Sequence, residues 1–334
     1  MFRAKCTICS SNAYFQPNRL KIGVAGANGA FGTKHLEALS QIGEVDVHAV
    51  MATTMAKAND VADHFEVSKR FDNYDAMLAS GEIDAVILAT PTQMHAEQGL
   101  KAMDAGLHVL VEIPMADNLR DSEALVAKQA ETGLVGMAGH VRRFNPSHQW
   151  VHNKITSGDF SVQQMDVQTY FFRRKNINAK GEPRSWTDHL LWHHACHTID
   201  LFMYQTGENI SEVHAVQGPK HPELGIAMDM GILMKTPKSK LCTLSLSFNN
   251  DGPLGTYFRY ICDNGTYVAR YDDLFDGNEQ QIDVSGVDVS MNGIELINRE
   301  FIAAISEKRE PNGSLSQCLP AMRVMHEIDK KLTD

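Results

Sequence analysis

The chain has 334 residues, of which 43% are hydrophobic and 22% charged, and its formal net charge is −10. This length exceeds what one hydrophobic core usually supports, so we expect two domains. The negative charge argues against a nucleic acid or an anionic membrane as partner, and no apolar run approaches the roughly 20 residues that span a bilayer. Six cysteines, scattered without a disulfide framework, favour a reducing cytoplasm.

The first 19 residues carry basic side chains but no apolar core, so they do not resemble a secretory signal. Cys6 and Cys9 form a single C-x-x-C pair there, and no second pair stands at metal-binding spacing. We therefore predict a disordered tail over residues 1–19 and no metal site.

A glycine-rich stretch over residues 20–32, LKIGVAGANGAFG, organises the first half of the chain. An apolar run ends at Gly26 and apolar side chains then recur at helical spacing, which predicts a strand, a tight turn and a helix. The spacing G-x-x-G-x-x-G is one residue longer than the usual dinucleotide fingerprint. Gly26, Gly29 and Gly32 suit the turn, the approach of a phosphate and close helix–strand packing. The helix N-terminus would then bind a pyrophosphate.

Further apolar runs alternate with helical patterns up to residue 140, and the predicted strands cover residues 45–51, 85–89, 108–111 and 135–138. This β-α-β series predicts a doubly wound parallel sheet, and hence a Rossmann domain over residues 20–140. Residues just beyond the carboxyl ends of such strands line the ligand crevice. The predicted cofactor-binding residues are Gly26, Asn28, Gly29, Ala30, Phe31, Thr53, Thr54, Thr90, Pro91, His95 and Glu112.

The end of the second predicted strand bears on the choice of cofactor. A site specific for NAD would place an acidic residue there to bind the ribose hydroxyls. Here Asp46 lies inside the strand, and Thr53, Thr54 and Lys57 follow its end. Two hydroxyls and a lysine suit a 2′-phosphate, so we predict NADP as the cofactor, with NAD possible. Alternatively, the two threonines only cap the next helix.

The second half of the chain, residues 141–334, has a different pattern. Apolar residues alternate with polar ones over residues 165–171, 211–217, 226–234, 241–248 and 257–270. This predicts an α+β domain with a large, mostly antiparallel, open-faced sheet. The uncovered face of such a sheet needs a partner, so we expect a homodimer or homotetramer formed through it.

Two short motifs resemble those of the Gfo/Idh/MocA oxidoreductases. The family's Glu-Lys-Pro corresponds to residues 112–114, and its Asp-x-x-x-His-x-x-Asp corresponds to His193, His197 and Asp200. The resemblance extends from the glycine-rich stretch to the C-terminus. It implies an NAD(P)-dependent dehydrogenase.

Two departures from the family motifs bear on the substrate. The family's lysine is Ile113 and its first aspartate is His193, so the Lys/His pair of sugar and polyol dehydrogenases is incomplete. Longer stretches, such as VEIPMAD, HVRRFNPSHQ and SLSFNNDGPLGTYFRYICDNGT, resemble family members from the protocatechuate 4,5-cleavage branch of lignin-derived aromatic catabolism. These oxidise the cyclic hemiacetal of a semialdehyde with NADP to a pyrone dicarboxylate, and we expect that reaction. A sugar or polyol dehydrogenase and a non-enzymatic NAD(P)-binding regulator are the alternatives.

Oxidation of a lactol needs a base near its hydroxyl group and a hydride acceptor near its carbon. Histidine can accept a proton near neutral pH. His193 and His197 are four residues apart and would share one helix face, so we predict both as catalytic. Core or capping histidines are the second interpretation, and a zinc pair, for which no third ligand is evident, is the third.

A dicarboxylate substrate calls for arginine side chains, whose planar guanidinium groups match carboxylates. Arg142 is one of several candidates near the expected junction of the domains. Trp186 and Trp192 could wall a flat ring or simply pack in the core. The predicted substrate-binding residues are Arg143, Arg173, Arg174 and Arg184.

Overall fold

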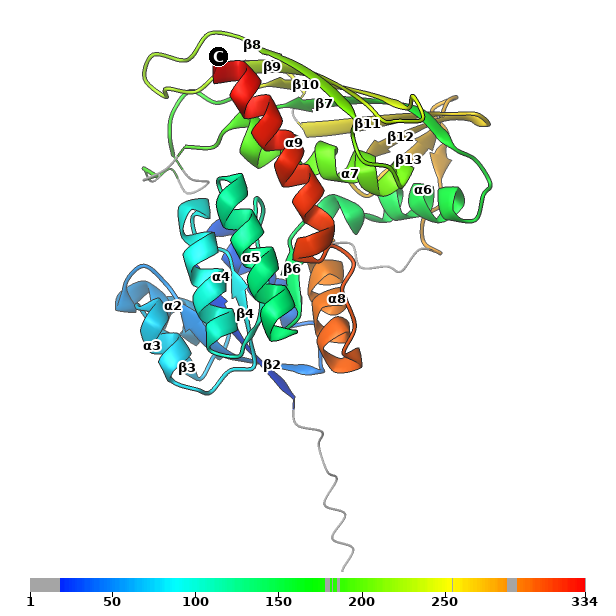
Figure 1. Ribbon diagram of the computed structural model, residues 1–334. Helices are drawn as coiled ribbons and strands as arrows, with labels where there is room; N and C mark the ends of the chain where they lie inside the picture. Colours follow the sequence, from blue (N-terminus) through cyan, green and yellow to red (C-terminus); the bar gives the residue numbers. More distant parts are fainter. Residues whose placement is uncertain are drawn as a thin grey trace, which may run out of the picture.

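The computed structural model describes residues 19–177, 181, 183–184, 187–253, 255–286 and 293–333. These residues form two β-sheets with helices packed against them (Figure 1). Except for Arg19, the predicted N-terminal tail lies outside the described residues.

The first sheet has six parallel strands in the order β3-β2-β1-β4-β5-β6. Its strands are β1 (Leu20–Ala25), β2 (Val45–Met51), β3 (Lys69–Phe71), β4 (Ala85–Leu88), β5 (His108–Val111) and β6 (Gly136–Ala138). The strand order reverses between β1 and β4, which in such sheets places the ligand crevice at their carboxyl ends. The predicted Rossmann architecture is confirmed.

Helices connect these strands, and several begin at side-chain caps. Thr54, Asn73 and Asn118 each accept a hydrogen bond from a backbone N–H three residues later. Strand β4 is buried along its whole length, as expected for a central parallel strand. The helices are α1 (Ala30–Leu39), α2 (Met55–His64), α3 (Tyr74–Ala79), the 3-10 turn η1 (Thr92–Met94), α4 (His95–Asp104) and α5 (Leu119–Thr132).

The second sheet has eight strands in the order β14-β13-β12-β11-β7-β10-β9-β8. Only β7 and β10 pair in parallel, so the predicted mostly antiparallel sheet is confirmed. In β9, Met230, Ile232 and Met234 are buried and their neighbours are more exposed, which matches the alternation in the sequence. The strands are β7 (Val162–Tyr170), β8 (Glu212–Gln217), β9 (Asp229–Lys235), β10 (Leu241–Ser247), β11 (Gly255–Cys262), β12 (Gly265–Arg270), β13 (Asp273–Asp276) and β14 (Gln281–Ile282).

Helices cover one face of this sheet, and its other face is open in the described part of the chain (Figure 1). The helical segments of this half are the 3-10 turn η2 (Val141–Arg143), α6 (Pro146–Thr156), the π-helix η3 (Leu190–Ala195), α7 (Cys196–Thr206), α8 (Gly293–Glu307) and α9 (Leu315–Thr333). Among the described helices, we find none with both the length and the apolar character needed to cross a membrane.

Helix α8 does not follow the predicted division of the chain at residue 140. Its Ile297 and Phe301 share a hydrophobic core with Ile22 and Leu36 of the Rossmann sheet and its first helix. The chain therefore returns to the nucleotide-binding half after building the second sheet, although the sequence pattern assigned all of 141–334 to the second domain.

Candidate active site

The turn between β1 and α1 fits tightly around its glycines. Gly26 has a φ of +78°, and a Cβ atom added there would lie 2.4 Å from the carbonyl oxygen of Ala89. A Cβ atom on Gly32 would lie 2.3 Å from the carbonyl oxygen of Gly26. Gly29 begins α1 with an extended backbone and without a side-chain cap, so the first amide groups of the helix remain available to an anion. This turn therefore fits the pyrophosphate of a dinucleotide.

The predicted residues at the end of β2 lie beside this turn. The amide of Thr53 donates to Asn28 Oδ1 at 3.3 Å, which ties the two loops together. Thr54 caps α2 by accepting from the amide of Lys57 at 3.3 Å, so the capping alternative is confirmed for this residue. Asp46 is the second residue of β2 and lies at the opposite end of the strand.

Two predicted cofactor ligands are instead committed to the protein, and the structure corrects their role. His95 is buried, and its ring nitrogens lie 2.9 Å from Pro114 O and 2.8 Å from Thr90 O. Glu112 is also buried and lies 2.9 Å from Nε2 of His35. Both side chains therefore fix the strand ends around the site. The other predicted residues at this edge are Ala30 and Phe31 at the start of α1, and Thr90 and Pro91 between β4 and η1.

The catalytic histidines that we predicted differ in their hydrogen bonds. Nδ1 of His193 accepts the backbone N–H of His189 at 3.0 Å, and Nε2 lies 3.2 Å from Oγ1 of Thr92. A neutral imidazole has a single acceptor nitrogen, so His193 has already used its acceptor and donates from Nε2 to Thr92. This contact joins the π-helix to the edge of the Rossmann sheet.

His197 has its ring nitrogens free of described partners. Its Nδ1 is enclosed without a hydrogen bond, and no bond to Nε2 is present among the described residues, which leaves Nε2 open to a ligand. Burial and, secondarily, the charge of Arg142 hold the pKa of His197 well below its usual range. Burial lowers the pKa of His193 to about 4. Both imidazoles are therefore neutral near pH 7, but only His197 has a free nitrogen to accept a proton.

Arg143, which we predicted to bind substrate, is a structural residue. Its Nε and Nη2 donate to the two carboxylate oxygens of Asp200 at 2.7 and 2.6 Å. Its Nη1 contacts Asn312 at 3.3 Å and Gln317 at 3.2 Å. The side chains of Arg143 and Asp200 are only 5% and 2% exposed. These hydrogen bonds and this burial argue against Arg143 as a ligand of a substrate carboxylate.

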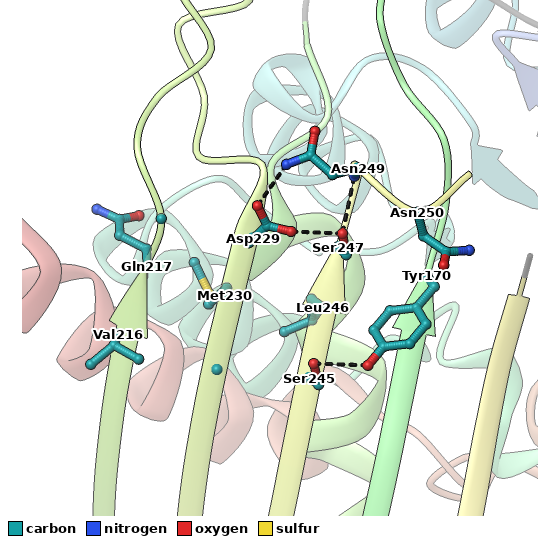
Figure 2. A pocket seen from close by; sticks show the side chains of 12 residues that line it. Tyr170, Val216, Gln217, Asp229, Met230, Ser245, Leu246, Ser247, Asn249 and Asn250 are labelled. Atoms are coloured by element: carbon teal, nitrogen blue, oxygen red, sulfur yellow. Dashed lines mark hydrogen bonds between the residues drawn. The ribbon is translucent and has the colours of Figure 1, made fainter. Parts of the chain in front are cut away.

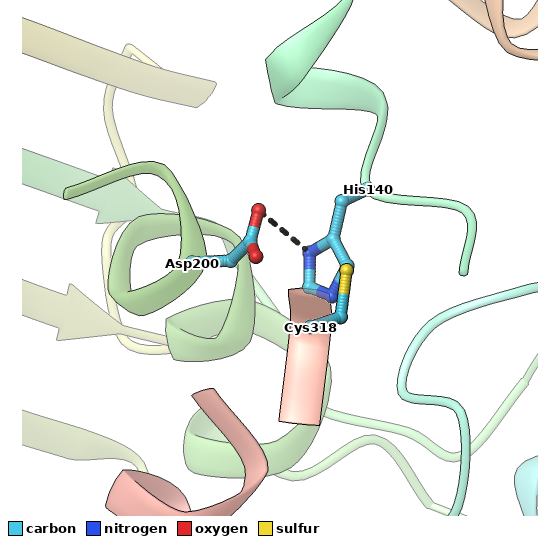
Figure 3. Close-up of side chains that lie close together, drawn as sticks. All are labelled: His140, Asp200 and Cys318. Carbon is cyan, nitrogen blue, oxygen red and sulfur yellow. Dashed lines mark ion pairs between the residues drawn. The ribbon is translucent and has the colours of Figure 1, made fainter. Parts of the chain in front are cut away.

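His140, Asp200 and Cys318 come together next to this ion pair (Figure 3). Their potential ligand atoms lie within 4.8 Å of one another. However, both oxygens of Asp200 are bound by a guanidinium, which would repel a cation. Burial raises the pKa of the Cys318 thiol, so this sulfur is neutral. This chemistry suits the ion pair better than a metal ion.

Arg173 and Arg184 meet at one acid that we did not predict, Asp188. Nη2 of Arg173 donates to Oδ2 of Asp188, and Nη1 of Arg184 donates to Oδ1 at 2.8 Å. Nη1 of Arg173 is enclosed and has no hydrogen-bond partner within the ranges that the structure describes. Arg174 is exposed, and its guanidinium lies over the exposed ring of Phe172. The structure therefore argues against Arg174 as a substrate ligand.

Arg142 is the arginine whose charge acts on the candidate base, His197. It is half-buried, its Nη1 donates to Asn145 at 3.3 Å, and its Nε is enclosed without a partner. No described carboxylate lies within 4.0 Å of it, in contrast to Arg143. Trp192 packs in the core, and Trp186 lies outside the described residues. The sequence offers little sign of these two residues. Asp188 is an acid within a stretch rich in basic residues, and Arg142 belongs to a run of two arginines.

Comparisons with known proteins agree with this architecture. Residues 20–140 match the oxidoreductase family with an NAD-binding Rossmann fold (GFO_IDH_MocA), and residues 146–288 match the C-terminal domain of bacterial oxidoreductases. The chain belongs to the Gfo/Idh/MocA oxidoreductase family. It is therefore an oxidoreductase with an NAD-binding Rossmann domain, as the sequence motifs predicted.

Relatives within the family differ greatly in their similarity to the chain. It is 61% identical over 313 residues to 4-carboxy-2-hydroxymuconate-6-semialdehyde dehydrogenase of Sphingobium sp. (strain NBRC 103272 / SYK-6), covering 94% of this chain and 99% of that protein. Two solved structures share its fold at low identity. UDP-N-acetylglucosamine 3-dehydrogenase of Acidithiobacillus ferrooxidans matches with a TM-score of 0.80 and 21% identity, over 94% of this chain and 98% of that one. A levoglucosan dehydrogenase in complex with NADH matches with a TM-score of 0.84 and 18% identity, over 95% and 97% of the chains.

Proposed function

We propose that the protein oxidises the cyclic hemiacetal of 4-carboxy-2-hydroxymuconate-6-semialdehyde to 2-pyrone-4,6-dicarboxylate, with NADP⁺ as the oxidant. The identity of 61% over 94% of the chain to a dehydrogenase named for this semialdehyde carries the proposal. Side chains that suit a dianion support it, because two buried guanidinium nitrogens, Nε of Arg142 and Nη1 of Arg173, have no hydrogen-bond partner among the described residues. A sugar or polyol substrate would leave these donors without an anion.

The proton of the lactol hydroxyl passes to Nε2 of His197, which is neutral near pH 7 and has no competing hydrogen bond. A nicotinamide cofactor bound at the turn between β1 and α1 would supply the acceptor for the hydride of the lactol carbon. His193 donates to Thr92 and so holds the π-helix against the nucleotide-binding edge. No thiol is needed, because no acyl intermediate has to form, and burial raises the pKa of the Cys196 thiol.

Two charged side chains would orient the ring of the substrate. The positive charge of Arg142 contributes to the lowered pKa of His197, and His194 makes a smaller contribution. The charge of Arg173 contributes in the same way to the lowered pKa of His194. We propose that the substrate binds with its lactol hydroxyl at His197 and one carboxylate towards each arginine.

NADP is proposed over NAD because the end of β2 carries hydroxyl groups in place of an acid. Thr53 is exposed there, and Lys57 is exposed in the first turn of α2. The amide groups of this first turn and the lysine would favour a 2′-phosphate. An NAD site would need a carboxylate in the same place.

The proposal is tested by mixing the purified protein with the ring-fission semialdehyde and following reduction of NADP⁺ or NAD⁺ by absorbance. We expect turnover with a preference for NADP⁺, and little with sugars. The variant His197→Ala should lose about 10²- to 10⁴-fold in kcat, the usual contribution of a general base, whereas His193→Ala should lose less. Turnover of sugars alone, or cofactor binding without turnover, would overturn the proposal.

We also propose that the protein assembles as a homodimer or homotetramer through the open face of the second sheet. Val216 and Leu233 are 72% and 43% exposed on that face. Towards one end of the strands, Asp229 accepts hydrogen bonds from Ser247 and Asn249 in a shallow depression (Figure 2). Sedimentation at the mass of a single chain would contradict this assembly.

A further inference from the structure

We propose that Asp188 is a positioning residue, which holds Arg173 and Arg184 as a receptor for one carboxylate of a flat ring dicarboxylate. This inference rests on the proposed function and deepens it, since it identifies which side chains select a doubly charged substrate.

Asp188 lies between two guanidinium groups and serves each with one oxygen. Its Oδ2 accepts from Nη2 of Arg173, and its Oδ1 accepts from Nη1 of Arg184 at 2.8 Å. The side chain of Asp188 is 12% exposed, and those of Arg173 and Arg184 are 16% and 19% exposed. The carboxylate therefore fixes the position of both arginines without saturating Arg173.

The unfilled position is Nη1 of Arg173. This nitrogen is enclosed, and no residue in the described part of the chain accepts a hydrogen bond from it. A buried donor, especially a charged one, costs free energy unless it is paired. Asp188 is held by two arginines and offers only Oδ2 to Arg173, so Nη1 is the position at which a ligand carboxylate would bind.

The surroundings of Arg173 fix the plane of its guanidinium group. Its Cζ lies 5.1 Å from the centre of the Phe248 ring. His194 packs against the same ring at 5.2 Å and approaches Oδ2 of Asp188 at 4.0 Å. Burial lowers the pKa of His194 to about 4, so this ring adds no charge near pH 7. A fixed, planar donor pair is the arrangement that recognises a carboxylate.

The position of this receptor relative to the base explains why it would select a dicarboxylate. Asp188, which holds Arg173, lies 4.0 Å from His194, three residues before the base, and the charge of Arg142 acts on His197 itself. A ring with a single carboxylate can satisfy only one of the two positions. A ring with two carboxylates in a 1,3-relation, as in the pyrone product, can satisfy both.

The test measures binding of benzene-1,3-dicarboxylate and of benzoate to the protein loaded with NADP⁺, by titration calorimetry. We expect Asp188→Asn and Arg173→Gln to weaken the dicarboxylate by about tenfold or more, the usual effect of losing a charge-assisted hydrogen bond. Benzoate should change little, because it can use the position at Arg142. Arg323→Gln serves as the control, since this side chain is 59% exposed on α9 and its ion pair among the described residues is with Glu123, at 3.4 Å.

The selectivity ratio, dicarboxylate over benzoate, is the decisive quantity, because a merely structural role of Asp188 would weaken both ligands alike. An unchanged ratio in both variants, or no binding of the dicarboxylate to the wild-type protein, would overturn the inference. If Asp188→Asn does not fold, Arg173→Gln alone decides. Absence of turnover with the semialdehyde, together with the expected change in ratio, would instead overturn the proposed function and leave this receptor in place.

Discussion

Two arginine–aspartate sites in this molecule use the same chemical groups for different purposes. Asp200 binds Arg143 with both carboxylate oxygens. The side-chain amide oxygens of Asn312 and Gln317 accept hydrogen bonds from the remaining guanidinium nitrogen, Nη1. Asp188 instead divides its oxygens between two arginines, and Nη1 of Arg173 remains unpaired. A completed ion pair belongs to the architecture, whereas an incomplete one has room for a ligand.

The same contrast appears between neighbours in the sequence. Arg142 has an enclosed nitrogen without a partner, and the adjacent Arg143 is saturated. Arg173 is half-buried, whereas the adjacent Arg174 is exposed. Local sequence therefore brings arginines to the site, but the partner acids decide which of them can meet a substrate.

The largest expected effect comes from breaking the completed pair. Arg143→Met would leave the carboxylate of Asp200 buried without its partner, and we expect the free energy of unfolding to fall by about 3–5 kcal/mol. Urea denaturation of both proteins at neutral pH measures this. The double variant Arg143→Met/Asp200→Leu should recover much of the loss, because it leaves no uncompensated charge. A decrease in the free energy of unfolding of less than about 1 kcal/mol would mean that the Arg143–Asp200 pair contributes no more than a surface ion pair. The two sites would then not differ in the way that we infer.

Acid should narrow the difference between wild type and Arg143→Met. Burial by itself would raise the pKa of Asp200. The charges of Arg143 and, secondarily, His140 outweigh burial, so the pKa lies below its ordinary value. A carboxyl group with a lowered pKa in the folded state stabilises the protein above its unfolded pKa of about 3.9, and this stability is lost as pH falls through the folded pKa. The stability advantage of the wild type should therefore shrink below about pH 4.

The sequence predicted the architecture well, because periodic apolar patterns determine both sheets. The fully apolar β4 and the alternating β9 each show the burial that their residues imply. The glycine spacing also identified the turn at Gly26 correctly, because its positive φ and its contact with Ala89 admit no larger residue. These features depend on local geometry and on the sorting of side chains by hydrophobicity.

The site was harder to predict, because pairing partners lie far apart in the chain. Arg143 and Asp200 are 57 residues apart, so the sequence could not reveal that one neutralises the other. His193 and His197 have the expected helical spacing, but the π-helix lets the amide of His189 occupy the acceptor nitrogen of His193. Nothing in the spacing distinguished the two histidines. Which of two candidates is free depends on tertiary contacts.

A smaller effect, on the acid side of the pH profile, tests whether Arg142 is the second incomplete site. In the wild type, kcat/KM should stay flat as pH falls through about 6.5, because burial and Arg142 hold the pKa of His197 well below that usual value. Removing a nearby positive charge makes protonation of the imidazole easier. Arg142→Gln should therefore raise the pKa that governs the acid limb, although burial, the larger cause, remains.

The same variant should raise KM for the semialdehyde about tenfold, because one carboxylate loses its charged partner. The measurement is kcat/KM from about pH 5 to about pH 8, with Arg323→Gln as the control for loss of a positive charge. Coincident acid limbs with an unchanged KM would mean that Arg142 neither meets the substrate nor acts on the base. In that case the unpaired Nε of Arg142 would be a buried donor with no role in binding. Arg173 would then be the one arginine of the two that offers a donor to a ligand.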